Sequence, residues 1–157
     1  RMAKKQIEYI VQKDDTVLYE ISINNLLNEQ WNIQYLVNAL KRSKTVAVTL
    51  KDEEVQGDIK LIGKQVQTKL SEYIGRVIEK HKPGVLILTG GDTAFSIATR
   101  MGAWGINLSG ELEPGIPMGL LQSVHYPNLP LITKSGSFGD EATYHRILKL
   151  LNTMRKE

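Results

Sequence analysis

Short apolar segments alternate with amphipathic segments along the chain, and this alternation constrains the fold more than any other feature. Residues 45–50 and 85–89, TVAVTL and VLILT, carry little polar alternation, which is typical of strands buried on both faces. Between them, residues 61–82 place apolar side chains every three or four positions, as one face of a helix does. Strands that alternate with helices predict an α/β domain, a three-layer sandwich with a mainly parallel sheet.

The remaining elements follow from the same patterns. We expect strands at 16–23 and 129–133, one or two strands within 106–121, and helices at 3–13, 31–42, 93–102 and 140–154. Asp140 is predicted to cap the last helix, and Pro83 to end the helix at 61–82. The charged segment 51–60 is most simply a solvated loop.

Composition excludes several classes of protein. None of the 157 residues is cysteine, which excludes disulfides and thiolate chemistry, and three widely spaced histidines predict no metal site. No apolar run approaches the roughly 20 residues of a membrane span, and no secretion signal is visible, so we expect a cytoplasmic protein without a membrane partner. The net charge of +3 arises mostly at the two ends and forms no basic face, so we expect no nucleic-acid partner.

Two glycine-rich loops stand where ligands bind in α/β folds, after a strand and before a helix. The first is TGGDTA, residues 89–94. Its paired glycines, Gly90 and Gly91, expose backbone N–H groups at a helix N-terminus, where an anion is favoured, and Thr93 adds a hydroxyl. Asp92 either holds a magnesium ion or caps the helix. The alternative for the whole loop is a tight turn with an aspartate cap.

The second loop is TKSGSFGD, residues 133–140. Lys134 could neutralise phosphate charge, while Gly136 and Gly139 let the backbone bend around the anion. The alternative is a flexible connection with a solvated lysine. Because both loops follow strands, the topology allows them to face each other across one crevice.

Other candidate residues favour structural roles. Glu111 and Glu113 share one side of an extended segment and could bind metal or act in acid–base chemistry, but a solvated strand face is the favoured interpretation. Trp104 could stack on a base, although packing is the more usual role. His125 and Tyr126 are expected to be surface residues. Neither the G-x-x-x-x-G-K-[ST] nor the G-x-G-x-x-G nucleotide motif is present.

Three segments, LTGGDTA, GELEPGIPMG and LPLITKSGSFGD, resemble in order and spacing the motifs of the nucleotide-binding C-terminal domain of the four-carbon acid sugar kinase family. Those motifs are approximately TGGDTA, E-x-x-PG-x-P-x-G and TK-x-GGFG. The resemblance is strong over 85–150 and only topological over 1–84. Members are two-domain enzymes that phosphorylate acids such as threonate and erythronate with ATP, and their N-terminal domain binds the sugar acid.

The resemblance implies ATP contacts at a set of loop residues: Gly90, Gly91, Asp92, Thr93, Lys134 and Gly136. It implies ATP and Mg²⁺ as cofactors, and it makes residues 1–157 a single nucleotide-binding domain, the C-terminal fragment of a two-domain kinase that is inactive alone. The sugar acid would bind through a missing N-terminal domain, and we expect the catalytic base on that domain or across the cleft. A homodimer is left open.

Two positions depart from the family pattern. Ser137 replaces a glycine, and the Gly-Ser turn that precedes the segment matching Met2 is missing.

The alternative function is a non-catalytic nucleotide- or anion-binding regulatory module.

Overall fold

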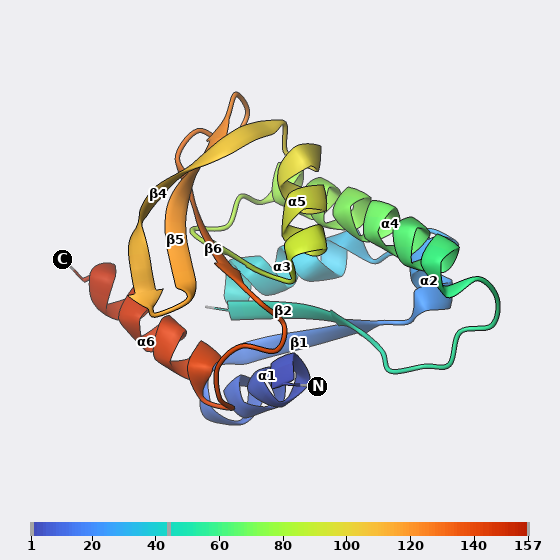
Figure 1. Ribbon diagram of the computed structural model, residues 1–157, viewed down its shortest axis with the longest axis horizontal. Coiled ribbons are helices and arrows are strands. Elements are labelled where there is room, and N and C mark those ends of the chain that lie inside the picture. The colour runs from blue at the N-terminus through green and yellow to red at the C-terminus, as the bar shows by residue number, and fades with distance from the viewer. Residues whose placement is uncertain (1, 44, 157) are drawn as a thin grey trace.

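Helices cover both faces of the strands in the computed structural model, which describes residues 2–43 and 45–156 (Figure 1). The helices are α1 (Met2–Lys13), α2 (Ile23–Leu27), α3 (Ile33–Arg42), α4 (Ile59–Lys80), α5 (Gly91–Arg100) and α6 (Thr143–Met154). The strands are β1 (Thr16–Ile21), β2 (Thr45–Leu50), β3 (Leu86–Thr89), β4 (Ala103–Glu113), β5 (Ile116–Ser123) and β6 (Leu129–Lys134). The predicted α/β class is confirmed.

The described strands form two sheets, where the sequence predicted one mainly parallel sheet. β1 and β2 pair in parallel, while the second sheet has the order β3-β6-β5-β4 and is parallel only between β3 and β6. The reason lies in the connections. Only two residues, Pro114 and Gly115, join β4 to β5, and five residues join β5 to β6. Connections this short cannot carry the crossover that a parallel pair requires.

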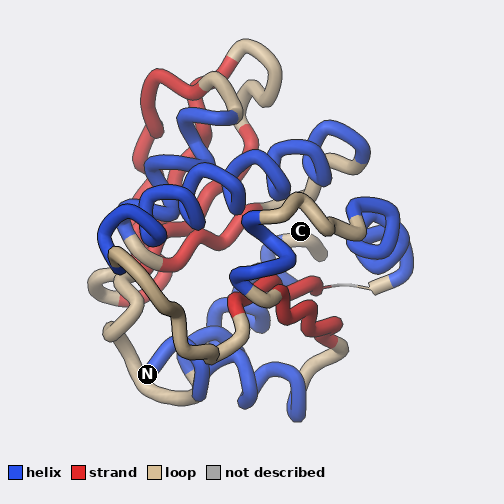
Figure 2. Tube along the Cα trace, turned by 90° about the vertical axis from the view of Figure 1, so that its right-hand side faces the viewer, coloured by secondary structure: helices blue, strands red, loops and turns tan. Residues whose placement is uncertain are grey.

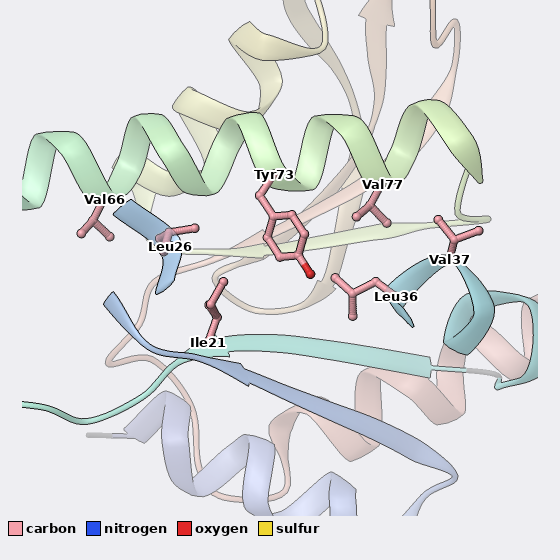
Figure 3. Packing of buried hydrophobic residues seen from close by; sticks show 7 residues of the cluster. All are labelled: Ile21, Leu26, Leu36, Val37, Val66, Tyr73 and Val77. Atoms are coloured by element: carbon pink, nitrogen blue, oxygen red, sulfur yellow. The ribbon is translucent and has the colours of Figure 1, made fainter. Parts of the chain in front are cut away.

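Three apolar clusters hold the layers together. In the first, α2, α3 and α4 pack on the two-stranded sheet around Tyr73, which is fully buried between Ile21 and Leu36 (Figure 3). The second cluster joins α4 and α5 to one face of the larger sheet through Ile97 and Leu131. The third joins α1 and α6 to the opposite face through Ile132 and other residues. The larger sheet is therefore the middle layer of a three-layer sandwich (Figures 1 and 2).

The helix boundaries correct two details of the sequence analysis. The short helix α2 was not predicted, although Ser22 caps it by accepting a hydrogen bond from the Asn25 N–H at 3.0 Å. Asp140 is not the N-cap of the last helix, because that helix begins at Thr143 and Asp140 Oδ1 accepts from the Ala142 N–H in the turn before it. Across the described residues, no helix is both long enough and apolar enough to cross a bilayer.

Candidate functional site

The first glycine loop lies where β3 ends and α5 begins. Gly90 is the N-cap residue of α5 and has a φ of 91°, a backbone conformation that favours glycine. Among the described side chains, none caps this helix start, so the N–H groups of Gly91, Asp92 and Thr93 have no acceptor within the helix. The Thr93 hydroxyl lies beside Gly90. Residues 90–93 therefore offer backbone donors and a hydroxyl to an anion.

Asp92 does not cap α5, so the proposed aspartate-capped turn is wrong. Its carboxylate stands in the first turn of the helix, is exposed, and lines a groove between α5 and α4. The other role that the sequence left open, a magnesium contact, stays a prediction. Within the described residues, no three His, Cys, Asp or Glu side chains gather in a way that could hold a metal ion.

The second glycine loop meets the first through the backbone. β3 and β6 run in parallel with Thr89 opposite Lys134, and the Gly90 N–H donates to the Lys134 carbonyl at 2.9 Å. Gly136 also adjoins this junction, since a Cβ built on it would lie 4.0 Å from Thr89 Cγ2. The structure thus brings residues 90–93, Lys134 and Gly136 together, as the shared position of the two loops predicted.

Lys134 lies beneath the second loop, with its side chain turned inward. The residue is only 3% exposed, and its ammonium donates to the Ser135 carbonyl at 2.6 Å and to the Phe138 carbonyl at 3.0 Å. It also stands 5.3 Å from the ring centroid of Tyr144. Burial lowers the pKa of the Lys134 ammonium. The alternative of a solvated lysine is therefore wrong, and the cation instead shapes the loop from inside.

Helix α1 holds the same loop from the same side. The Gln6 side-chain amide donates to the carbonyls of Phe138 and Asp140, at 2.9 and 2.7 Å, and the Ala3 N–H donates to the Gly136 carbonyl at 3.2 Å. Gln6 is fully buried. With Lys134, these donors turn the carbonyls of residues 135, 136, 138 and 140 toward the protein interior.

This inward turn of the carbonyls fixes the direction of the N–H groups. The described peptide bonds include no cis bond, and a trans peptide unit points its C=O and N–H in opposite directions. The N–H groups of Gly136, Ser137 and Gly139, which follow the bonded carbonyls of residues 135, 136 and 138, are therefore directed away from the protein interior. Ser137 does not have a positive φ, so serine fits without backbone strain where the family pattern has glycine. Successive N–H groups on one side of a turn form an anion-binding concavity.

Two residues of this site were missed by the sequence analysis. Gln6 occupies the buried stripe of α1, one turn before Ile10, and a polar side chain at such a position is the signal that could have found it. The Tyr144 hydroxyl is hydrogen-bonded to the Thr89 hydroxyl at the end of β3. Burial raises the pKa of the Tyr144 hydroxyl, so it stays protonated.

The tip of the β4–β5 hairpin is fixed against the second loop. Arg146 of α6 donates through Nε and Nη2 to the two carboxylate oxygens of Glu113, at 2.6 and 3.0 Å, and through Nη1 to Asp140 at 2.8 Å. The hydrogen bond from Arg146 holds the pKa of the Asp140 carboxyl below its usual value. The Phe138 ring covers Gly115 so closely that a Cβ there would lie 2.8 Å from it.

Some of the remaining candidates behave as expected, since Glu111 and His125 are exposed, and others do not. Glu113 does not belong to a solvated strand face, because it pairs with Arg146, and Glu111 instead accepts from the Gly115 N–H at 3.2 Å. A register shift in the β4–β5 pairing lies between Glu111 and Glu113, and the two carboxylates bond different partners. Trp104 is 69% exposed, so the packing role is wrong, while Tyr126 is partly buried in the second cluster.

Comparison with known proteins identifies the family of this chain. The family model described as the nucleotide-binding C-terminal domain matches residues 1–144. The chain belongs to this family. The resemblance stated for its glycine loops is confirmed.

Two curated relatives are D-threonate kinases. The enzyme of Salmonella typhimurium strain LT2 is 37% identical over 82 residues, which are 52% of this chain and 19% of that protein. The enzyme of Bordetella bronchiseptica is 31% identical over 90 residues, which are 57% of this chain and 22% of that protein. The match thus spans about a fifth of the length of each curated relative.

Solved structures of low identity share the fold. A domain of unknown function from Bordetella bronchiseptica, crystallised with citrate as a domain-swapped dimer, has a TM-score of 0.78 at 23% identity and is matched over 94% of this chain and 37% of that chain. A protein of Salmonella typhimurium LT2 described as a putative tRNA synthase has a TM-score of 0.72 at 20% identity, over 94% of this chain and 37% of that chain. In both cases the nucleotide-binding C-terminal domain matches a little over a third of a longer chain.

Proposed function

We propose that this domain binds ATP with Mg²⁺ at the two joined glycine loops and forms the nucleotide-binding part of a kinase for four-carbon sugar acids of the threonate or erythronate type. The observation that carries the proposal is the orientation of the loop after β6. Its carbonyls are bonded to Gln6, Lys134 and Ala3, so the N–H groups of Gly136, Ser137 and Gly139 are left for an anion.

The chain supplies donors from two directions to the phosphates. Gly91, Asp92 and Thr93 contribute N–H groups at the start of α5, and Gly136 contributes from the facing loop. Lys134 adds positive charge from beneath the loop, without direct contact. Phosphoryl transfer depends mainly on such positioning and charge neutralisation.

The proposed Mg²⁺ needs little from the protein itself. Magnesium is commonly held by one or two carboxylates together with substrate phosphates and water, so a cluster of acidic residues is not required. Asp92, in the first turn of α5 beside the glycine pair, is the carboxylate that we assign to it. The ion would neutralise phosphate charge during transfer.

We place the binding of the sugar acid and the catalytic base outside this chain, and we expect the isolated domain not to transfer phosphate. This part of the proposal is supported by the relatives named D-threonate kinase, which are about five times longer than the matched segment. A homodimer is the proposed assembly, supported by domain-swapped dimers among the solved relatives. Cytoplasmic location stays a prediction.

Calorimetric titration tests nucleotide binding. We expect heat on titration of ATP or a non-hydrolysable analogue with Mg²⁺, and no heat with the variant Gly91→Val. Absence of binding at millimolar ATP by the folded domain would overturn the proposal.

A transfer assay separates the kinase from the regulatory module. The longer protein that contains this domain is incubated with ATP and either D-threonate or D-erythronate, and phosphorylated acid is measured. ATP binding without transfer to any four-carbon acid would favour the regulatory module.

A further inference from the structure

A groove of about 380 Å³ runs between α4 and α5, and of the residues that line it the proposed phosphate and Mg²⁺ site uses only Asp92. Asp92, Ser96 and Thr99 of α5 line one side at the spacing of a single helix face, and Thr68 and Ser71 of α4 line the other. The groove begins at the first turn of α5, immediately after the glycine pair. From Asp92 to Arg100, α5 rises about 12 Å, so the groove is long enough for a base and its sugar.

The hydroxyl groups on the walls are arranged as acceptors. The Thr68 hydroxyl donates to the Lys64 carbonyl at 3.0 Å, and the Ser71 hydroxyl donates to the Thr68 carbonyl at 2.9 Å. The single proton of each hydroxyl is therefore already hydrogen-bonded to the helix backbone. Ser96 is similarly directed to the Gln67 carbonyl at 3.5 Å. These oxygens can therefore only accept hydrogen bonds from a ligand in the groove. The walls therefore suit a neutral ligand that carries N–H or O–H donors.

An aromatic ring and a guanidinium complete the groove. Phe95 is 76% exposed, which is unusual for a phenylalanine on a helix that packs against a sheet. Its ring lines the groove and offers a face or edge to a planar ligand. Arg100 lies at the far end, over Gly75 of α4, where a Cβ would stand 3.0 Å from the arginine Cγ.

We propose that the α4–α5 groove holds the base of the nucleotide, an aminopurine that stacks on Phe95 and donates hydrogen bonds to the hydroxyl acceptors. The inference rests on the proposed function, because the groove becomes a base site only if the adjoining glycine loops hold the phosphates. It goes beyond that function by placing base recognition on α4 and α5, which the loop motifs do not include.

The test compares ATP with inorganic tripolyphosphate, each with Mg²⁺, by calorimetry on the whole chain. Phe95→Ala is expected to weaken ATP binding at least about tenfold and to leave tripolyphosphate binding unchanged. Thr99→Trp, which fills the groove from an exposed position, is expected to do the same. Trp104→Ala removes another exposed aromatic ring outside the groove and is the matched control, with both affinities unchanged.

The outcomes are distinguishable. If Phe95→Ala and Thr99→Trp bind ATP as the wild type does while Gly91→Val does not, the base site is wrong and the proposed function stands. Equal loss of ATP and tripolyphosphate binding in Phe95→Ala also overturns the base site, because the ring then acts on the phosphate loops. If the wild type binds neither compound, the proposed function and the base site are both wrong.

Discussion

The helix starts in the two halves of the molecule are completed in different ways. In the half built on β1 and β2, side chains cap the helices: Asp58 accepts from the N–H groups of Lys60 and Leu61 at the start of α4, and Asn32 accepts from Tyr35 at the start of α3. In the half built on the larger sheet, the N-cap of α5 is Gly90, which has no side chain to accept a hydrogen bond from the first N–H groups of the helix. The first half caps these helix starts with side chains, whereas the start of α5 has no side-chain cap and is where we propose that phosphate binds.

Of the substitutions considered, Gly91→Val is expected to have the largest effect, and that effect is on ATP affinity. Apart from the adjacent residues and the backbone of its own helix, no atom lies within 4 Å of a Cβ built at Gly91, so we expect the fold to tolerate the side chain while the approach of phosphate is blocked. We expect ATP affinity to fall at least about 100-fold and the melting temperature to change little. Calorimetry and thermal unfolding measure the two quantities.

Gly139→Ala is the matched control for that substitution. Gly139 has a φ of 85°, and a Cβ there would lie 2.3 Å from Thr143 Oγ1, so its melting temperature should drop clearly. A melting temperature that falls equally in both variants would show that Gly91 is a structural turn residue.

Lys134→Met is expected to weaken ATP binding about tenfold, because it removes a buried positive charge beneath the loop. The wild type should also lose ATP affinity as pH rises through the lowered pKa of Lys134, below its ordinary 10.5. Titrations of ATP at increasing pH, up to the ordinary lysine pKa of 10.5, would detect this loss, and Lys134→Met should lack it. If Lys134→Met kept the same pH dependence of ATP affinity as the wild type, the charge of Lys134 would not contribute to ATP binding.

The lowered pKa of Lys134 affects stability in the opposite direction to ATP affinity. Between the lowered pKa of Lys134 and 10.5, the unfolded chain binds a proton that the folded chain does not. This group therefore makes the free energy of unfolding rise with pH across that window. Chemical denaturation at matched pH values separates this effect from ATP affinity.

Gln6→Leu is expected to lower the free energy of unfolding by about 1–3 kcal/mol, because two carbonyls of the second loop lose a buried donor. ATP affinity should fall with it, since the Asp140 carbonyl then loses its donor and the Phe138 carbonyl is held by Lys134 alone. Denaturant titration gives the first quantity and calorimetry the second. Normal ATP affinity in a destabilised variant would show that the loop does not depend on α1.

Asp58→Ala gives the smallest expected effect, a loss of about 1 kcal/mol in stability from the missing cap, with ATP affinity unchanged. Denaturant titration measures the loss. A change in ATP affinity in Asp58→Ala would mean that the two halves are coupled, so that the α4 cap does not act on stability alone.

The sequence predicted the parts of the fold that depend on local pattern. The β-branched run of β2 and the apolar stripe of α4 were found because burial selects side chains at fixed periods. The pairing of β4 and β5 was less accessible, because Pro114-Gly115 indicated a turn without saying which strands it joins. The glycines were identifiable from their type, since backbone approach to a ligand requires small residues.

The support beneath the glycine loop could not be predicted in the same way. The inward turn of Lys134 depends on two carbonyls, those of Ser135 and Phe138, that the fold places beside its ammonium. The reach of Gln6 to Asp140 depends on the contact of α1 with α6. Neither relation leaves a periodic trace along the chain. Long-range hydrogen bonds of this kind are decided by tertiary packing.

The hydrogen bonds from α1 to the second loop also impose an order of assembly. Gln6 and Asp140 are 134 positions apart, so α1 is synthesised long before the loop that it supports. Until the ribosome has released that distant segment, the Gln6 amide has no carbonyl to meet, and closing so long a stretch of chain is slow. Ligand competence should therefore appear as one of the last events of folding, after the two-stranded half has already formed its own core.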